Sequence, residues 1–291
     1  MPSSTSIFLT LCLLIAGCAA PARSTSTPAA GNPSAPLSAA PVTSSNPAPA
    51  TVSGEITVFA ASSLTDAFNE LGERFKTSNP NATVTFNFGA STQLFTQLDQ
   101  GAQADIFASA DQVQMDRARG AGRIAGADVV FATNRLVVAA PGNNPGSVRG
   151  AADLARPGLR IVTTQPDVPI GTYTQAMLDR MSQSAQYGAD FKDKVNANIV
   201  SHEANVRQIV SKVQLGEADA GVVYKSDVTP QVASQLAIFD IPDEYNTLAS
   251  YPLALVRDGP NQAGAAAFAA FVLSPEGQAI LERWNFVRVR A

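Results

Sequence analysis

The chain has 291 residues, of which 45% are hydrophobic and 15% charged, enough to bury one large core or two modest ones. The formal net charge is −4 and no block of Lys or Arg occurs, which argues against nucleic acid as a partner. The two cysteines, Cys12 and Cys18, lie at the N-terminus, and His202 is the single histidine. We therefore expect no disulfide in the rest of the chain, no protein-ligated metal and no cofactor.

The N-terminus has the pattern of an export signal. Residues 7–15 form an apolar run that is too short to span a bilayer. The run ends in LIAGC (residues 14–18), which resembles the bacterial lipobox, in which the cysteine is lipidated. This predicts a signal peptide over residues 1–18 and lipidation of Cys18. Residues 1–6 lack the Lys or Arg typical of such signals, so an ordinary secretory signal with an incidental cysteine is the alternative.

Residues 19–54 consist mainly of Ala, Pro, Ser and Thr and contain few large apolar side chains. Such a segment cannot bury enough surface to offset the entropy lost on ordering. We expect a disordered tether between the membrane and the folded part.

The folded part alternates strand and helix patterns from residue 55 onward. Its first half predicts strands at 56–61, 82–88 and 104–108, with helices from Ser63, over 91–98 and from Asp111. Further strands are expected at 135–140, 160–163, 220–224, 237–239 and 253–256, and further helices at 172–180, 206–215, 262–272 and 274–284. This pattern predicts an α/β fold with mostly parallel sheets, built as two lobes with a ligand cleft between them.

Two predicted strand-to-helix turns carry serine. Ser62 and Ser63 follow the first strand, and Ser91 follows the second. Helix N-termini attract anions, and ligands bind open α/β sheets at the carboxyl ends of the strands. The alternative is that each serine simply caps its helix, with Ser63 and Asp66 forming a capping box. A third candidate is Tyr224, where a buried strand ends; its hydroxyl could instead bond to the backbone.

Six motifs together resemble the periplasmic molybdate-binding proteins of ABC importers, and the resemblance spans residues 55–289. In chain order they are ITVFAASSLTDA (56–67), GAQADIFASAD (101–111), NRLVV (134–138), VPIGTY (168–173), NVR (205–207) and GVVYKSD (221–227). The resemblance implies a two-lobe periplasmic-binding-protein fold that holds a tetrahedral oxyanion.

The resemblance also implies which residues bind the oxyanion. The family's two serines and tyrosine fall on Ser63, Ser91 and Tyr224. Its backbone amide donors fall on Ile170 and Val206. The family usually has a small residue where Ile170 stands, and Ser62 is the alternative donor if the match is displaced by one residue.

A shell of hydroxyl and N–H groups contains donors only. Molybdate, tungstate and sulfate are fully deprotonated near neutral pH, so donors alone satisfy them. Phosphate keeps a proton, which would face donors at a cost of roughly 1–3 kcal/mol. Lys225 and Arg207 lie beside predicted donors, and we interpret both as solvated surface charges.

Three alternatives stay open. The same fold could bind sulfate or another small anion. Ser62 or Ser63 could be the nucleophile of a hydrolase with His202 as base and Asp227 as its partner, although no Gly-x-Ser-x-Gly motif surrounds either serine. The chain could also be a structural surface lipoprotein without a ligand.

The resemblance implies a lobe division and a set of partners. Lobe one is expected from residues 55–133 and 228–291, and lobe two from residues 134–227, with two chain crossings as the hinge. The expected partners are a membrane permease, its cytoplasmic ATPase and the membrane itself, through lipid on Cys18. We expect a non-enzymatic monomer on the outer face of the cytoplasmic membrane or in the periplasm.

Overall fold

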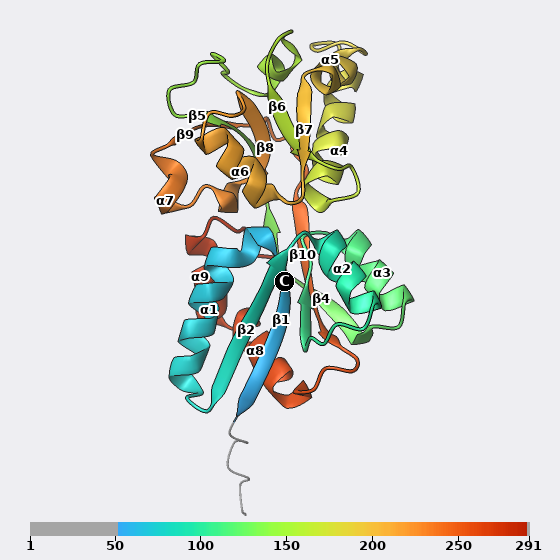
Figure 1. Cartoon of the computed structure of the whole chain (residues 1–291), viewed down its shortest axis with the longest axis vertical. Coiled ribbons are helices and arrows are strands. Elements are labelled where there is room, and N and C mark those ends of the chain that lie inside the picture. Colours follow the sequence, from blue (N-terminus) through green and yellow to red (C-terminus); the bar gives the residue numbers. More distant parts are fainter. Residues whose placement is uncertain (1–51, 290–291) are drawn as a thin grey trace, which may run out of the picture. The chain divides into compact units, whose positions relative to one another are not determined.

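The computed structural model describes residues 52–289. Cys18 and the predicted signal peptide lie outside the described residues. The described part contains two five-stranded sheets, and each sheet carries its own helices (Figure 1). We call the unit around the first sheet the first lobe and the unit around the second sheet the second lobe. The predicted two-lobe α/β fold is confirmed, but the expectation of mostly parallel sheets is wrong: each sheet contains two parallel and two antiparallel strand pairs.

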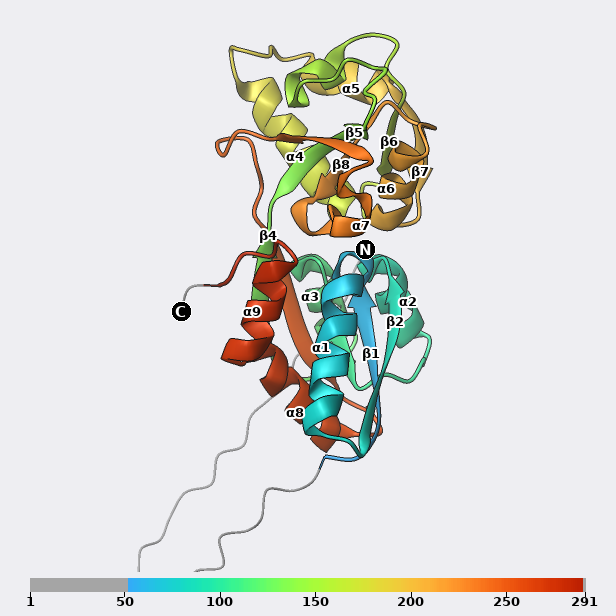
Figure 2. The ribbon, with the colours of Figure 1, turned by 90° about the vertical axis from the view of Figure 1, so that its left-hand side faces the viewer.

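The first lobe is built on the sheet β2-β1-β3-β10-β4. Its strands are β1 (Gly54–Ala61), β2 (Ala82–Gly89), β3 (Ile106–Ala108), β4 (Ile124–Asn134) and β10 (Ala249–Val256). β1 runs parallel to β2 and β3, whereas β10 is antiparallel to β3 and β4. The carboxyl ends of β1 and β2 therefore meet at one edge of the sheet, which faces the second lobe (Figure 2).

Helices cover both faces of the first sheet (Figure 1). They are the 3-10 turn η1 (Ser62–Leu64), α1 (Thr65–Ser78), α2 (Ser91–Asp99), α3 (Gln112–Gly120), α8 (Gln262–Leu273) and α9 (Pro275–Arg283). Phe68, Leu71 and Phe75 of α1 recur at helical spacing and are buried in the core. Along β1, Val58 and Ala60 join that core, whereas Phe59 joins the core under α2 and α3, as alternation along a strand requires.

The second lobe is built on the sheet β7-β6-β8-β5-β9. Its strands are β5 (Leu136–Pro141), β6 (Ile161–Thr164), β7 (Ile199–Glu203), β8 (Ala220–Tyr224) and β9 (Leu236–Asp240). Its helices are η2 (Ala151–Ala155), α4 (Pro169–Gln183), α5 (Phe191–Ala197), α6 (Val206–Gln214), η3 (Lys225–Asp227) and α7 (Pro230–Ala233). β6 runs parallel to β7 and β8, and β5 is antiparallel to β8 and β9.

The predicted return of the chain to lobe one at residue 228 is wrong. β9 pairs with β5 over five residue pairs from Val137↔Asp240 to Pro141↔Leu236, so the second lobe continues through residue 240. The reason is that β8 pairs with only one edge of β5. The backbone groups on the other edge of β5 also need hydrogen-bond partners, and β9 supplies them. The chain crosses between the lobes at residues 134–136 and again between β9 and β10.

The strands β4 and β7, the helices α5 and α7, and the 3-10 turns η2 and η3 are absent from the sequence-based prediction. β4 and β7 are edge strands whose exposed residues break the apolar pattern. β10 begins at Ala249, four residues before the predicted strand at 253. Among the described helices no single one is long and apolar enough to cross a membrane; α8 and α9 reach that length and composition only as a pair bent by 64°.

Candidate functional site

A small cavity collects the sequence-predicted site residues. Its wall includes all five of them: Ser63, Ser91, Ile170, Val206 and Tyr224. The remaining lining residues are small, apolar or uncharged: Ala61, Ser62, Gly89, Ala90, Ala110, Val168, Pro169 and Asn205. Ser63 and Ser91 come from the first lobe and the other three from the second lobe. The cavity therefore lies between the lobes, and no charged side chain lines it.

Neither predicted serine caps its helix. The cap of α2 is Ala90, and Ser91 is the first helical residue. Ser91 Oγ accepts a hydrogen bond from the backbone N–H of Ala110 at 2.9 Å. Because an N–H group can only donate, the hydroxyl hydrogen of Ser91 stays available to an acceptor in the cavity. The capping alternative for Ser91 is therefore wrong.

Ser63 lies within η1, and α1 begins at Thr65 without a side-chain cap. The alternative in which Ser63 and Asp66 form a capping box is therefore wrong as well. Instead, Ser63 Oγ lies 2.8 Å from the hydroxyl of Tyr251 in β10. Both residues are buried. The bond joins η1, at the cavity, to β10, the strand with which the chain re-enters the first lobe.

The hydroxyl of Tyr224 is buried and has no hydrogen-bond partner within residues 52–289. Its ring is held edge-on between Tyr173 and Tyr251, at centroid distances of 6.4 and 5.8 Å. Burial raises the pKa of Tyr224 well above its ordinary value, so the hydroxyl keeps its proton and remains a donor. The alternative, in which the Tyr224 hydroxyl bonds to the backbone, is therefore wrong. A buried unsatisfied hydroxyl costs about 1–3 kcal/mol, which a ligand acceptor would recover.

Two helices of the second lobe begin at the cavity. α4 starts at Pro169, whose ring suits the first helical position, and Ile170 follows. α6 starts at Val206 behind the cap Asn205, whose side chain accepts from the backbone N–H of Gln208. The first N–H groups of a helix lack intrahelical partners and carry the positive end of its dipole. Ile170 and Val206, the residues that the family resemblance indicates, lie in these first turns and line the cavity.

The turn before α4 is tightly packed. A Cβ on Gly171 would lie 2.2 Å from the carbonyl oxygen of Gln165, closer than any real contact. Glycine at this position therefore allows the loop to fold back on the helix, and the loop holds the first turn of α4 against the cavity.

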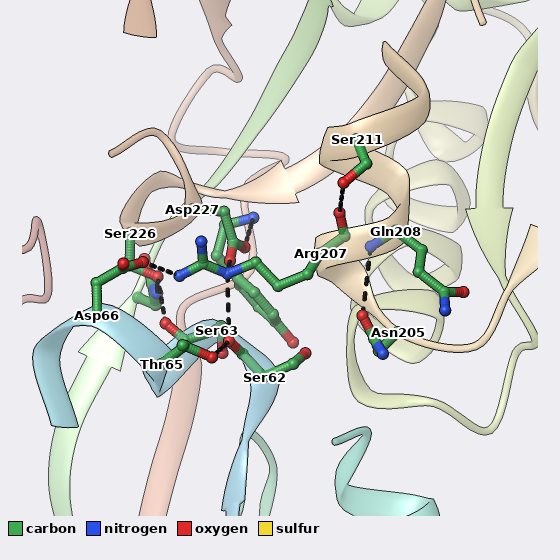
Figure 3. Close-up of polar contacts among 12 residues, drawn as sticks. Ser62, Ser63, Thr65, Asp66, Asn205, Arg207, Gln208, Ser211, Ser226 and Asp227 are labelled. Atoms are coloured by element: carbon green, nitrogen blue, oxygen red, sulfur yellow. Dashed lines mark hydrogen bonds and ion pairs between the residues drawn. The ribbon is translucent and has the colours of Figure 1, made fainter. Parts of the chain in front are cut away.

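Arg207 is not the solvated surface charge that the sequence suggested. It forms ion pairs with Asp66 of the first lobe and with Asp227 of the second, the latter at 3.3 Å. Its Nε also donates to the carbonyl oxygen of Ser62 at 3.2 Å. Figure 3 shows the guanidinium reaching from α6 to η1 and the start of α1. Sequence reasoning missed this contact because its partners lie far from Arg207 along the chain. Lys225 is a surface charge, 3.6 Å from Asp240.

On the opposite side of the cavity, α2 and α3 also contact the second lobe. Thr92 Oγ1 and Gln114 Nε2 both donate to the carbonyl oxygen of Asp167, at 3.2 and 3.4 Å. Asp167 precedes α4. The two lobes are thus in direct polar contact through Arg207 and through Thr92 and Gln114.

The hydrolase arrangement does not assemble. His202 is exposed in β7, and no hydrogen bond found in the described residues joins it to Ser62 or Ser63. Asp227, the expected partner of the base, faces Arg207 and accepts from the backbone N–H of Tyr224 at 3.2 Å. Across residues 52–289, no group of three or more His, Cys, Asp or Glu side chains is placed to hold a metal ion.

Comparisons with known proteins agree with the motifs. The chain is 40% identical over 233 residues to the molybdate-binding protein ModA of Mycobacterium tuberculosis, covering 80% of this chain and 84% of the relative. It is 31% identical over 234 residues to a putative ABC transporter substrate-binding lipoprotein of Bacillus subtilis, covering 79% of this chain and 85% of the relative.

Solved structures share the fold. The periplasmic molybdate-binding protein of Azotobacter vinelandii matches with a TM-score of 0.70 and 22% identity, covering 81% of this chain and 100% of the other. The sulfate-binding protein SubI of M. tuberculosis matches with a TM-score of 0.73 and 19% identity, covering 81% and 87%. At such identities the likeness concerns the fold alone, and the fold accommodates more than one oxyanion. The sequence-based resemblance to the molybdate-binding proteins is confirmed by the closer relatives. A family model matches residues 56–287, and the chain therefore belongs to the bacterial extracellular solute-binding protein family.

Proposed function

We propose that this protein is the solute-binding component of an ABC importer, and that its solute is molybdate or the nearly isosteric tungstate. The observation that carries the proposal is the convergence of three hydroxyl groups and two helix N-termini on one uncharged cavity. Ser63, Ser91 and Tyr224 would donate from their hydroxyl groups, and Ile170 and Val206 from their backbone N–H groups. The molybdate-binding relatives support the choice of ligand.

Donors alone suit a fully deprotonated tetrahedral dianion. Every oxygen of molybdate accepts, and neither a carboxylate nor a cation lines the cavity. Phosphate would retain a proton, which finds no acceptor when the hydroxyl groups are all oriented as donors, at a cost of roughly 1–3 kcal/mol. Sulfate is the alternative ligand, because it carries the same charge and the fold also occurs in a sulfate-binding protein.

Neutral donors also suit delivery. An Arg or Lys clamp would hold the anion more strongly, whereas a transport protein must release it to the permease. The serines belong to the first lobe and the tyrosine and both N–H donors to the second. Opening the cleft would therefore remove about half the donors in one movement. We infer binding and release without catalysis, by a monomer whose partners are a permease and its cytoplasmic ATPase.

Titration calorimetry of the purified protein with molybdate, tungstate, sulfate and phosphate tests the ligand. We expect tight binding of molybdate and tungstate, weaker binding of sulfate, and no binding of phosphate. Tight phosphate binding, or no oxyanion binding, would refute the proposed ligand and leave the family and fold standing.

We further infer export and lipid anchoring through Cys18, which the lipoprotein relative of B. subtilis supports. The lipid would keep the binding protein at the outer face of the cytoplasmic membrane. Metabolic labelling with a radioactive fatty acid should label the wild-type protein and leave the Cys18→Ser variant unlabelled. Equal labelling of both would refute lipidation at this cysteine.

A further inference from the structure

A buried hydrogen-bond network joins Ser63 to the crossing segments between the lobes. Its members are Asn134 at the end of β4, Tyr251 in β10, Ser226 in η3 and Ser63 itself. The exposed fractions of these four residues are 0, 0, 2 and 3%. Asn134 Nδ2 lies 2.8 Å from Ser226 Oγ and 3.5 Å from the Tyr251 hydroxyl, which lies 2.8 Å from Ser63 Oγ. The four side chains are thus shielded from bulk solvent, and most of their hydrogen-bond partners are other protein groups.

The direction of each hydrogen bond follows from Asn134. The backbone N–H of Arg135 donates to Asn134 Oδ1 at 2.9 Å, which fixes the orientation of the amide. The Nδ2 group therefore faces Tyr251 and can only donate. The Tyr251 oxygen accepts on that side. The 2.8 Å distance between the Tyr251 and Ser63 hydroxyls lets either one donate, and donation by Tyr251 is the direction that gives its single hydrogen an acceptor within the network.

In that arrangement Ser63 Oγ accepts from Tyr251, and the hydrogen of Ser63 is directed elsewhere. Ser63 lines the cavity, which is where an anion would accept that hydrogen. Ser91 is arranged in the same way, because its oxygen accepts from the N–H of Ala110. Both serines thus receive one hydrogen bond from the protein and offer their own hydrogen to the cavity.

We propose that Tyr251 is a positioning residue that makes Ser63 a donor toward the bound oxyanion and prevents Ser63 from acting as an acceptor. This inference rests on the proposed function. It adds a basis for selectivity, because a serine free to rotate could accept the proton of hydrogen phosphate. The Tyr251 ring is well held for this role, with Phe286, Tyr224 and Phe131 packed edge-on at centroid distances of 5.2, 5.8 and 6.3 Å.

A double-mutant cycle tests the inference. Molybdate affinity would be measured by calorimetry for wild type, Tyr251→Phe, Ser63→Ala and the double variant. Net hydrogen-bond contributions of about 0.5–1.5 kcal/mol predict that Tyr251→Phe weakens binding about 2- to 10-fold. If Tyr251 acts through Ser63, the same change should have no further effect in the Ser63→Ala background. Tyr251→Phe should also raise the affinity for phosphate relative to molybdate.

The matched control is Tyr245→Phe, because the Tyr245 hydroxyl also bonds to a serine, Ser184 Oγ at 3.0 Å, but neither residue lines the cavity. It should leave affinity and selectivity unchanged. A second variant, Asn134→Asp, replaces the Nδ2 donor by an acceptor that would draw the Tyr251 hydrogen away from Ser63. Asn134→Asp should weaken molybdate binding more when Tyr251 is present than when it has been replaced by Phe.

The outcomes separate this inference from the proposed function. The positioning role is overturned if Tyr251→Phe weakens molybdate binding equally in the wild type and in Ser63→Ala, or does not weaken it at all. Molybdate binding by the wild type would still stand in that case. Absence of oxyanion binding by the wild type overturns the proposed function, and this inference with it.

Discussion

Arg207 of the second lobe forms an ion pair with Asp66 of the first lobe, beside the candidate site. About a quarter of each side chain is exposed, 27% for Arg207 and 29% for Asp66. Opening the cleft would separate the two groups, whereas the pairing of Arg207 with Asp227 joins residues of one lobe. The Arg207–Asp66 bridge therefore stabilises the closed arrangement specifically.

Asp66→Asn should shift the protein toward the open form and weaken ligand binding. An ion pair with this exposure contributes about 1 kcal/mol at most, so we expect molybdate affinity to fall by up to about 5-fold. Small-angle X-ray scattering of the ligand-free variant should give a larger radius of gyration. Asp179→Asn is the control, because Asp179 pairs with Lys192 within the second lobe; an equal effect of both variants would contradict a role in closure.

Ser91→Ala should weaken molybdate binding about 10- to 100-fold. The change removes a donor from the cavity and leaves the N–H of Ala110 without its acceptor, a loss of about 1–3 kcal/mol. Calorimetry would measure the affinity. Ser211→Ala provides the comparison, because the Ser211 hydroxyl bonds to a carbonyl within α6 and should leave affinity intact. Wild-type affinity in Ser91→Ala would exclude Ser91 from the binding shell.

Tyr224→Phe should separate stability from binding. The Tyr224 hydroxyl has no hydrogen-bond partner in the described residues. Its removal should therefore leave the free energy of unfolding unchanged or raise it by about 1 kcal/mol. Molybdate affinity should nevertheless fall about 10-fold. Denaturant unfolding without ligand and calorimetry with ligand measure the two effects.

Tyr173→Phe gives the contrasting result for stability. The Tyr173 hydroxyl accepts from the backbone N–H of Ser250 at 3.2 Å, so its loss should lower the free energy of unfolding. If Tyr224→Phe destabilised the ligand-free protein as much as Tyr173→Phe, the Tyr224 hydroxyl would have a partner there after all.

Asp227 should make the stability of the protein depend on pH. Burial raises its pKa to about 7, partly opposed by Arg207, so between about pH 4 and pH 7 the folded state holds a proton that the unfolded state has released. The free energy of unfolding should therefore fall as the pH rises from about 5 to 7, by up to about 1.4 kcal/mol per pH unit. Burial also raises the pKa of Asp111, to about 6, which adds to the same slope.

Asp227→Asn should flatten this slope in denaturant unfolding measured at several pH values. Asp240→Asn serves as the control, because that side chain is 82% exposed and should leave the slope unchanged. An identical slope in wild type and Asp227→Asn would mean that Asp227 is ionised throughout this range.

Sequence patterns predicted the turns that carry the candidate residues, and these residues line one cavity. Apolar runs and helical spacing are local properties, so they located β1, β2 and β8 and the turns at which Ser63, Ser91 and Tyr224 stand. Parallel strands place their carboxyl ends at a common edge, which explains why the two serines meet. Assigning the five residues to ligand contacts required the resemblance to a known family, because each motif alone also fits a helix cap or a strand end.

The partners of these residues were decided by the tertiary structure. Ser63 and Tyr251 are 188 positions apart, and Arg207 and Asp66 are 141 apart. No local periodicity encodes such pairs, because they exist only once two lobes close on each other. Local patterns also do not encode the place of β9, which joins the second sheet because one edge of β5 is otherwise unpaired. The sequence alone thus determined the fold class and which residues face the cleft. The packing of the lobes decided which way each hydroxyl donates and which charges hold the cleft closed.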